Sequence, residues 1–397
     1  MTSLNTQFDL IRQSATVAMA DLVVSLRAQG REIIGLQTGD PDFATPPAVI
    51  DVAVRAMQSG ATHYGPSQGT LELRKAVAGK IASVSGAGYN PESEILVTHG
   101  SIHAYYCAVQ AILNPGDDVL IPDPSWATHA NMITMLRGQA VRVPAPAENG
   151  FLPPLEAWEQ ALTPRTRALV LNWPSNPTGA IAPREYLLEL AKIAARHDLW
   201  MIGDEVYDHL VYDGVKHTSI AALPGMKERT LLLNSLSKTY AMTGWRVGYL
   251  AAPEQVIQHA LKASQNSITC VTPFIQKAAA FALSDPGVQQ ATRDMRDAYA
   301  HRRELVLRLA REHGPSPVKI TPPDGAFYYF MDMRSLNMPS IQICERLLEE
   351  ASVALVPGVA FGEHGEGFAR LAFTSSEAEL EAGFKAILAW ADNSIIR

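Results

Sequence analysis

The amino-acid sequence predicts an α/β fold, in which a mostly parallel sheet is flanked by helices and a smaller α+β domain follows. Between Glu94 and about residue 284, short apolar runs alternate with segments of helical spacing, a pattern typical of a parallel sheet covered on both faces. After Ser284 a long charged helix is predicted over about 286–313, followed by short strands and further helices. This change of pattern indicates a second domain.

Turn and capping residues mark where the predicted helices begin and end. Thr70 is a good N-cap, Gly30 is a good residue just past a helix, and Gly314 followed by proline is a clear stop. Ser376 and Glu379 form a capping box for a final helix. The predicted helices span about residues 20–30, 46–60, 70–85, 102–113, 183–197 and 286–313, with one more from 339 and one at the C-terminus.

Short apolar runs bounded by turn residues predict the strands. These strands span about residues 32–36, 95–97, 118–121, 167–172, 199–203, 230–234, 247–251 and 325–330, with two more near 353 and 370. In sheets of this kind, ligands bind beyond the carboxyl ends of the strands. The residues expected at those ends, and therefore near a ligand site, are Gly100, Trp126, Asn172, Asp204 and Lys238.

The stretch from Ser235 to Tyr249, S-L-S-K-T-Y-A-M-T-G-W-R-V-G-Y, carries the most distinctive chemistry. It presents Ser237 and Lys238 at the mouth of a buried strand and Arg246 eight positions later. A lysine in such a place is costly to desolvate unless it is paired or used, and it becomes a candidate for Schiff-base chemistry. Taken alone, Lys238 fits an ordinary solvent-exposed loop lysine better, so residues elsewhere in the chain decide between the two interpretations.

Two glycine-containing turns could bring backbone N–H groups close to a ligand. Gly100-Ser101 lies between a strand and a helix that starts at Ile102, which is the usual geometry for holding a phosphate. Gly39, in G-D-P-D-F at 39–43, could act similarly, although a plain turn explains Gly-Asp-Pro equally well. Since every strand-to-helix turn resembles the first pattern, neither turn identifies a ligand by itself.

Composition and charge exclude several classes of protein. The 397 residues are 47% hydrophobic and 18% charged, with a formal net charge of -7, which is ordinary for a globular protein. The basic residues are not clustered as in nucleic-acid-binding proteins, and no apolar run is long enough to span a membrane. The N-terminus carries Asp9, Arg12 and Asp21, unlike a secretory signal, and the three cysteines are too few and too scattered for a disulfide framework. We therefore expect a cytoplasmic protein.

Taken together, the motifs of this chain resemble those of the fold-type I, pyridoxal-phosphate-dependent aminotransferases of the aspartate aminotransferase family. The likeness extends over nearly the whole chain, and the order and spacing of the motifs make it highly specific. The motifs are S-A-T at 14–16, G-D-P-D-F at 39–43, Y-G-P-S-Q-G-T-L-E-L-R at 64–74, N-P-T-G at 176–179, D-E-V-Y at 204–207, the stretch at 235–249, G-A-F-Y at 325–328 and R-L-A-F at 370–373.

The resemblance implies a cofactor and a domain organisation. The cofactor is expected to be pyridoxal 5'-phosphate. Residues 48–284 are expected to form the large cofactor-binding domain, and residues 1–47 are expected to join residues 285–397 in the small domain, which is thus built from both termini. No metal is expected.

The resemblance also implies roles around the cofactor ring. Lys238 would form the Schiff base and shuttle a proton between the substrate Cα and the cofactor. Asp204 would keep the ring nitrogen protonated. Tyr207 and Asn176 would form hydrogen bonds with the ring hydroxyl oxygen, and Trp126 would lie flat on the ring. Without the resemblance, Asp204 is better interpreted as an N-cap or ion-pair partner, and Trp126 as a core aromatic.

At the other end of the cofactor, the phosphate is expected to meet backbone N–H groups, hydroxyls and one cation. The residues implied are Ser101, Ile102, Ser235, Ser237 and Arg246. Tyr64 would reach the phosphate from a neighbouring subunit, so the resemblance implies a homodimer with shared active sites.

The substrate α-carboxylate is expected to be bound by Arg370 in a bidentate pair, with help from Gly39 and Asn176. Without the resemblance, a surface salt bridge is the default interpretation of Arg370. His129 is matched in some family members by a histidine behind the aspartate, although a lone histidine is more often simply a core or surface residue.

Several departures from the family pattern bear on the substrate. Many relatives carry Gly-Lys where this chain has Ser101-Ile102, and in the acidic-substrate branch that lysine helps to hold the distal carboxylate. Strict aspartate specificity is therefore doubtful, and an apolar, aromatic or otherwise non-acidic amino donor is favoured. Ser14 or Thr16 could contact a polar substrate, and an Arg or Lys of the partner subunit could restore acidic recognition. His99 and His103 are four residues apart, but a turn separates them and no third ligand is evident.

The leading hypothesis is a transaminase that moves an amino group between an L-amino acid and a 2-oxoacid by a ping-pong mechanism. A second hypothesis keeps the cofactor but changes the outcome to elimination by a lyase, decarboxylation or oxidation. The motifs around Asp204 and Lys238 serve all of these reactions alike. A third hypothesis is a non-enzymatic ligand sensor, which is disfavoured because the motifs begin within the first fifteen residues and leave no room for a DNA-binding extension.

Overall fold

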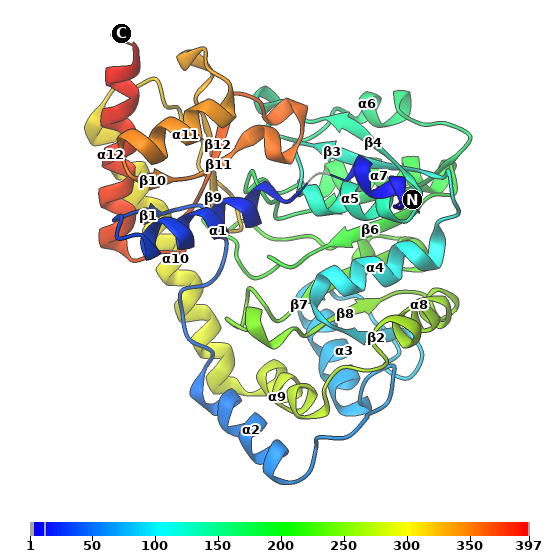
Figure 1. The fold of residues 1–397 in the computed structure, drawn as a ribbon. Coiled ribbons are helices and arrows are strands. Elements are labelled where there is room, and N and C mark those ends of the chain that lie inside the picture. Colours follow the sequence, from blue (N-terminus) through cyan, green and yellow to red (C-terminus); the bar gives the residue numbers. More distant parts are fainter. Residues whose placement is uncertain (1–3, 12, 396–397) are drawn as a thin grey trace.

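A seven-stranded sheet forms the middle layer of the larger part of the protein (Figure 1). Its strands are β2 (Ile95–Thr98), β3 (Asp118–Asp123), β4 (Gln139–Pro144), β5 (Thr166–Asn172), β6 (Trp200–Asp204), β7 (Thr230–Ser235) and β8 (Gly248–Ala251). They lie in the order β2–β8–β7–β6–β5–β3–β4; β8 is antiparallel to both neighbours and the remaining pairs are parallel. The predicted mostly parallel sheet is thus confirmed. The computed structural model describes residues 4–11 and 13–395, so Arg12 lies outside the described residues.

Helices cover both faces of this sheet, because alternate residues of a strand point to opposite sides. In β5, Val170 packs into one buried cluster with residues of α4 and α8, whereas Leu169 and Leu171 pack into another with residues of α7. The helices of this part are α2 (Pro47–Gln58), α3 (Leu71–Ser85), α4 (Gly100–Ile112), α5 (Ala127–Met135), α6 (Leu155–Gln160), α7 (Arg184–Arg196), α8 (Glu254–Ser267) and α9 (Pro273–Ser284).

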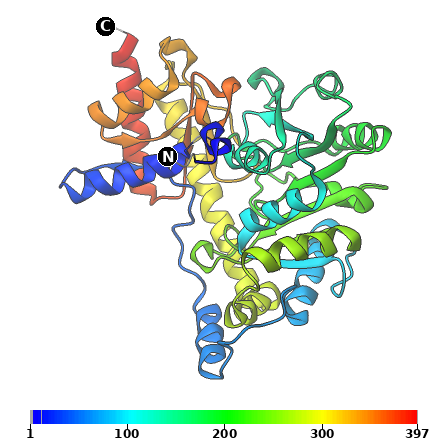
Figure 2. The same cartoon turned by 45° about the vertical axis from the view of Figure 1, so that its right-hand side comes forward.

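The smaller part combines segments from the two ends of the chain, and the long helix α10 runs into it from the larger part (Figures 1 and 2). Its strands form a parallel pair, β1 with β10, and an antiparallel sheet in the order β11–β12–β9. Its elements are α1 (Ala15–Ala28), β1 (Ile34–Gly35), α10 (Pro286–His313), β9 (Tyr328–Asp332), α11 (Ser340–Glu350), β10 (Val353–Ala354), β11 (Val356–Pro357), β12 (Phe368–Ala372) and α12 (Glu377–Ile395).

Short 3-10 helices connect many of these elements. They lie at Thr6–Leu10, Ala147–Asn149, Ile220–Ala222, Lys227–Arg229, Thr243–Trp245, Arg334–Leu336, Gly358–Phe361 and Glu363–Gly365.

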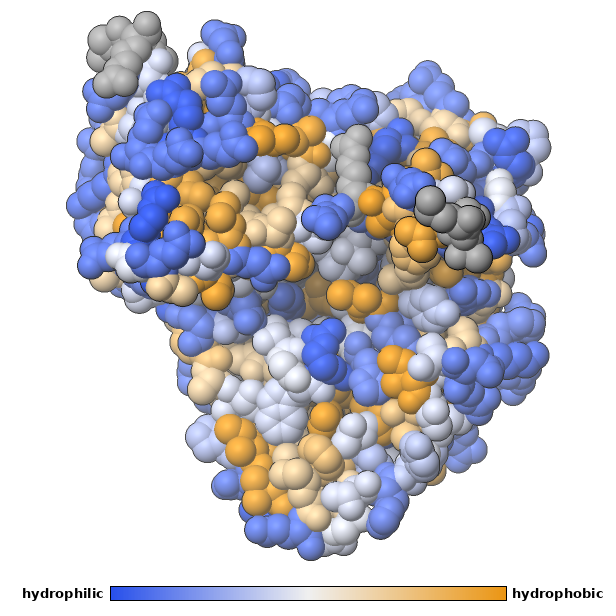
Figure 3. All heavy atoms as spheres, viewed as in Figure 1, coloured by the Kyte–Doolittle hydropathy of each residue, from blue (hydrophilic) through white to orange (hydrophobic). Residues whose placement is uncertain are grey.

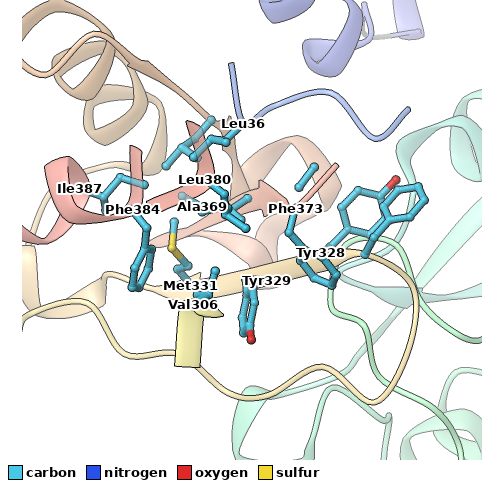
Figure 4. Close-up of a cluster of buried hydrophobic side chains, with 14 of the residues drawn as sticks. Leu36, Val306, Tyr328, Tyr329, Met331, Ala369, Phe373, Leu380, Phe384 and Ile387 are labelled. Atoms are coloured by element: carbon cyan, nitrogen blue, oxygen red, sulfur yellow. The ribbon is translucent and has the colours of Figure 1, made fainter. Parts of the chain in front are cut away.

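One apolar cluster joins the two ends of the chain (Figure 4). Leu36, just after β1, packs in this cluster with Phe373, Phe384 and Ile387 of the C-terminal segment, and each of them is at most 1% exposed. Burying a side chain of this size stabilises a fold by about 1.5–3 kcal/mol, so contacts between segments that are distant in sequence hold this part together. Tyr328 belongs to the same cluster and also reaches the site described below.

Several element boundaries differ from the predicted ones for identifiable reasons. The strand expected at 32–36 spans two residues, because it pairs only with the equally short β10. The helix expected from residue 20 begins at Ala15, where the Ser14 side chain accepts a hydrogen bond from the N–H of Val17. The elements α5, α6, β4, α8 and α9 have no counterpart among the predicted ones. In the part of the chain that is described, no helix is long and apolar enough to cross a membrane.

Candidate active site

Two adjoining cavities lie beyond the carboxyl ends of the sheet strands. The first, here the Asp204 cavity, has a volume of about 190 Å³ and is lined by Thr16, Gly39, Ser101, Trp126, Asn172, Asn176, Asp204, Val206, Tyr207, Lys238, Tyr328 and Arg370. The second, here the Arg246 cavity, has a volume of about 220 Å³ and is lined by Gly39, Asp40, Ser101, Ile102, Trp126, Val206, Ser235, Ser237, Lys238, Thr243 and Arg246. Since Lys238 lines both, they form one continuous site.

All the residues that the family resemblance assigns to the cofactor or the substrate carboxylate, except Tyr64, line one of these cavities, and so does Thr16, whereas Ser14 and Gly100 do not. Tyr64 is 88% exposed, in the loop before α3. The parallel topology explains the grouping, because it places the ends of β5, β6 and β7 side by side. Within the described ranges, the structure has no group of three or more histidine, cysteine or acidic side chains that could hold a metal ion.

Lys238 follows β7 and its amine is held in place from a distant part of the chain. The Nζ atom donates a hydrogen bond to the carbonyl oxygen of Gly39 at 2.6 Å and lies 5.6 Å from the centre of the Phe327 ring. Burial lowers the pKa of Lys238 to about 8, and the positive charges of Arg370 and Arg246 contribute, while nearby carboxylates oppose the change. An amine with this pKa exchanges a proton readily near neutral pH.

Asp204 ends β6 with one carboxylate oxygen bound and the other free. Its Oδ2 lies 3.0 Å from Nε2 of His129. The His129 side chain is buried and packs edge-on against the Trp126 indole, with an angle of 88° between the two ring planes. Its Oδ1 is buried and, among the described residues, has no hydrogen-bond partner. A buried oxygen without a donor costs free energy, so this wall of the cavity is suited to a ligand that brings an N–H group. The histidine behind the aspartate is where the family resemblance implies it.

Tyr207 and Tyr328 form a buried pair beside Asp204. Their hydroxyl oxygens lie 2.9 Å apart, and burial raises the pKa of both, so both hydroxyls stay protonated. A side chain at Gly39 would place its Cβ 2.1 Å from the Tyr328 hydroxyl, so only glycine fits there. Tyr328 is not among the predicted site residues, although it ends the G-A-F-Y motif, and that motif is the signal that could have identified it.

Arg370, in β12, is a buried cation. It is 1% exposed, and its two terminal nitrogens donate to Asn176 Oδ1 at 2.8 Å and to the backbone carbonyl of Gln37 at 2.6 Å. Its guanidinium carbon lies 4.4 Å from the centre of the Tyr328 ring. Its Nε has no partner among the described residues, and burial lowers its pKa. These neutral partners leave the positive charge available for an anion in the cavity.

Asn172 links the ends of two neighbouring strands beside the cavity. Asn172 ends β5, donates to the backbone carbonyl of Asp204 at 3.1 Å and accepts the N–H of Asn176 at 2.9 Å. It therefore connects two strand ends on the cavity floor. The strand pattern predicts Asn172 near a ligand site, although it is not among the residues that the family resemblance assigns to the cofactor or the substrate.

The Arg246 cavity has a different construction, with the first turn of α4 facing it. Gly100 has φ +75°, and a Cβ there would lie 2.8 Å from a terminal nitrogen of Arg246. The backbone therefore approaches this cation closely, next to the N–H groups of Ser101 and Ile102 at the positive end of the helix dipole. Arg246 is itself exposed, and Ser235 and Ser237 add hydroxyls. These groups together can hold a dianion.

Comparison with known proteins gives a consistent result. The family described as aminotransferase class I and II matches residues 31–387. The chain is 41% identical to aromatic-amino-acid aminotransferase 2 of Thermococcus litoralis and 40% identical to an aspartate aminotransferase of Pyrococcus abyssi, in both cases over 96% of each chain. It is similar in structure to the aspartate aminotransferase from Thermus thermophilus with maleate, with a TM-score of 0.93, 38% identity and coverage of 98% of this chain and 100% of the other.

Proposed function

Because this chain belongs to the class I and II aminotransferases and is a pyridoxal-phosphate-dependent transaminase, we propose that Lys238 is its Schiff-base lysine and proton shuttle. The reaction is the ping-pong transfer of an amino group between an L-amino acid and a 2-oxoacid. The observation that carries the proposal is that Lys238 lines the same cavity as Asp204, whose buried Oδ1 has no hydrogen-bond partner among the residues that the structure describes.

The residues present fit pyridoxal 5'-phosphate at both of its ends. The groups around Gly100 and Arg246 suit the phosphate, and the free Oδ1 of Asp204 suits the protonated ring nitrogen. When bound, the cofactor withdraws electrons from the substrate Cα and so makes the Cα proton acidic. We assign the stacking surface for the ring to Trp126, which lines both cavities.

Lys238 is proposed to move the proton. With a pKa of about 8, its Nζ can accept a proton from the substrate Cα and deliver it again without a large free-energy barrier. The bond to the Gly39 carbonyl is a defined resting position for the free amine. Tyr207, whose hydroxyl stays protonated, is proposed to donate to the ring hydroxyl oxygen together with the side-chain amide of Asn176.

Arg370 is proposed to bind the substrate α-carboxylate. The guanidinium offers several donors in a fixed fork. Asn176 and Gln37 accept from the terminal nitrogens, whereas Nε has no partner within the described ranges. Gly39 is proposed to assist, because its lack of a side chain lets the backbone lie against the Tyr328 hydroxyl at the cavity wall.

The amino donor is proposed to be non-acidic. The cations that line the two cavities are Lys238, Arg370 and Arg246, and each already has a proposed role. Ile102, 41% exposed, has no charge with which to hold a distal carboxylate. An aromatic or aliphatic donor therefore suits the described part of the site, whereas recognition of an acidic donor requires a cation from a partner subunit.

The enzyme is proposed to act as a cytoplasmic homodimer with shared active sites. Tyr64 is exposed and outside the cavities of its own chain, which suits a role in the site of a partner. Apolar side chains on α2, namely Ile50, Val54 and Met57, are 39–43% exposed. Apolar atoms are also visible in the lower part of the molecule in Figure 3, where Figure 1 places α2. The three cysteines are unpaired, as in a reducing compartment.

We keep the predicted domain boundaries as a proposal, with 48–284 as the large domain and 1–47 plus 285–397 as the small one. The pairing of β1 with β10 and the Leu36 contacts in Figure 4 support the assignment of the N-terminal segment to the small domain.

A panel of amino donors tests the proposed function. Each donor is mixed with the yellow holoenzyme, and the loss of the visible absorption band reports the first half-reaction. We expect the loss with aromatic or aliphatic donors and complete turnover only when a 2-oxoacid is added. Ammonia, carbon dioxide or peroxide released without an oxoacid would instead favour a lyase, decarboxylase or oxidase.

A further inference from the structure

Behind the turn that carries Asp204 and Tyr207 lies a buried ion pair that no step above uses. The Lys80 ammonium in α3 lies 2.8 Å from Oδ2 of Asp208, and each side chain is 4% exposed. Burial alone lowers the pKa of Lys80 and raises the pKa of Asp208, but the surrounding charges and hydrogen-bonding groups, above all each other, together more than offset burial. Both groups therefore remain charged at neutral pH. Removing two charges from water is costly, so a buried pair is a weak source of stability, and what it positions matters more.

Asp208 connects this pair to the strand that leads to Lys238. The same Oδ2 accepts a hydrogen bond from Nδ2 of Asn234 at 2.9 Å. That amide nitrogen also donates to the carbonyl oxygen of Glu205 at 2.8 Å, and Oδ1 of Asn234 accepts the N–H of Ser235 at 2.7 Å. Continuous polar contacts thus run from α3, through the turn after β6, to the end of β7.

The turn after β6 has two faces with different partners. Asp204 and Tyr207 line the Asp204 cavity, whereas Glu205 and Asp208 do not. Glu205 is held by Nε2 of His217 at 3.0 Å, and Asp208 is held by Lys80 as described. Because all four residues belong to the one turn at 204–208, a displacement of Glu205 and Asp208 also displaces the side chains that line the cavity.

We propose that the Lys80–Asp208 pair, acting through Asn234, is a positioning device for the catalytic groups. It holds the turn at 204–208 against the end of β7, so that the Asp204 carboxylate and the Lys238 amine keep their relative placement. Neither Lys80 nor Asp208 lines the Asp204 or the Arg246 cavity. The inference rests on the proposed roles of Asp204 and Lys238.

Two variants of the holoenzyme test this inference. The double variant Lys80→Met/Asp208→Asn removes both buried charges at nearly constant volume, and Asn234→Ala leaves the ion pair intact but breaks its link to β7. In both we measure the pH midpoint of the visible absorption band, the single-turnover rate with an amino donor and the KM for that donor. We expect the midpoint to move by about half a pH unit or more and the rate to fall about tenfold, with KM within about twofold.

Arg303→Met is the matched control, because Arg303 is a buried cation that binds Asp213 at 2.7 Å outside both cavities. It should lower the melting temperature and leave the absorption midpoint unchanged. If Asn234→Ala keeps the wild-type midpoint and rate, the pair is merely structural and the proposal is overturned, whether or not the double variant folds. A Lys238→Ala variant with the turnover of the wild-type enzyme would instead contradict the proposed function.

Discussion

The two cavities that share Lys238 are lined by different kinds of chemical groups. The Asp204 cavity is lined by buried side chains, two of which have a polar atom with no partner in the described part of the chain, namely Oδ1 of Asp204 and Nε of Arg370. The Arg246 cavity is lined by a helix N-terminus, small hydroxyls and an exposed cation. Unpartnered buried atoms are costly in the empty protein and gain most when a ligand completes them. Substitutions in the Asp204 cavity should therefore lower the rate, and substitutions in the Arg246 cavity should lower cofactor affinity.

The largest effect is expected from Asp204→Ala. Without the carboxylate, nothing in the cavity holds a proton on the ring nitrogen, and the rate of the first half-reaction should fall by about a thousandfold or more. Stopped-flow absorbance with a reactive amino donor measures this rate. Asp118→Ala removes another buried carboxylate, at the opposite end of β3, and should reduce stability without a comparable loss of rate. An Asp204→Ala enzyme with a near-normal rate would contradict the idea that the Asp204 cavity controls the rate and the Arg246 cavity controls cofactor affinity.

A smaller loss is expected from Arg370→Lys. A charged fork becomes a single point contact, so kcat/KM for the amino donor should fall about 10- to 100-fold, equivalent to about 1.5–3 kcal/mol. Cofactor affinity should change little, since Arg370 does not line the Arg246 cavity. Steady-state kinetics and cofactor titration measure the two quantities, and Arg303→Lys, outside both cavities, is the control. An unchanged specificity constant would show that the carboxylate is bound elsewhere.

Gly100→Ala should affect the other cavity. The new Cβ would lie 2.8 Å from the Arg246 guanidinium, at a backbone with φ +75°, so we expect the cofactor dissociation constant to rise about tenfold. At saturating cofactor, kcat should stay within about twofold of wild type. Gly86→Ala is the matched control, because Gly86 has φ +77° but open space around it. A Gly100→Ala variant that binds cofactor normally but reacts slowly would show that the Arg246 cavity affects the rate rather than cofactor affinity.

The last prediction concerns the stability of the cofactor-free protein rather than its activity. Its Lys238 pKa is lowered from 10.5 to about 8, so between these values the unfolded chain binds the proton and the folded chain does not. The free energy of unfolding should therefore rise with pH across this window, and below pH 8 the full penalty applies. Lys238→Met should then stabilise the cofactor-free protein at pH 7 by about 2 kcal/mol. Urea unfolding at pH 7 and pH 10 measures this, with the exposed Lys192→Met as control.

The sequence predicts the sheet and the residues at its strand ends well, because both depend on local pattern. The remaining site residues, such as Arg370, are predicted only through the family resemblance. Apolar runs in β5, β6 and β7 are buried on both faces, and parallel pairing then places Asn172, Asp204 and Lys238 at one edge whatever the details of packing. By contrast β4, an edge strand, is mostly only partly buried and lacks the continuous apolar run that predicts a strand.

Contacts between distant segments could not be predicted from local pattern. The hydrogen bond from Lys238 to Gly39 joins residues 199 positions apart, and the one from Arg370 to Asn176 joins residues 194 positions apart. Tyr328 contacts Tyr207 only because β9 of the small part approaches the end of β6. The Lys80–Asp208 pair is likewise invisible in the sequence, where Lys80 is one charged residue among others on a helix.

The most direct measurement is reduction of the yellow holoenzyme with borohydride, followed by peptide mass mapping. The account predicts one cofactor-derived label per chain, on Lys238, and no label on the Lys238→Ala variant, which should still bind the cofactor noncovalently. A label on another lysine, or wild-type labelling of the variant, would contradict it.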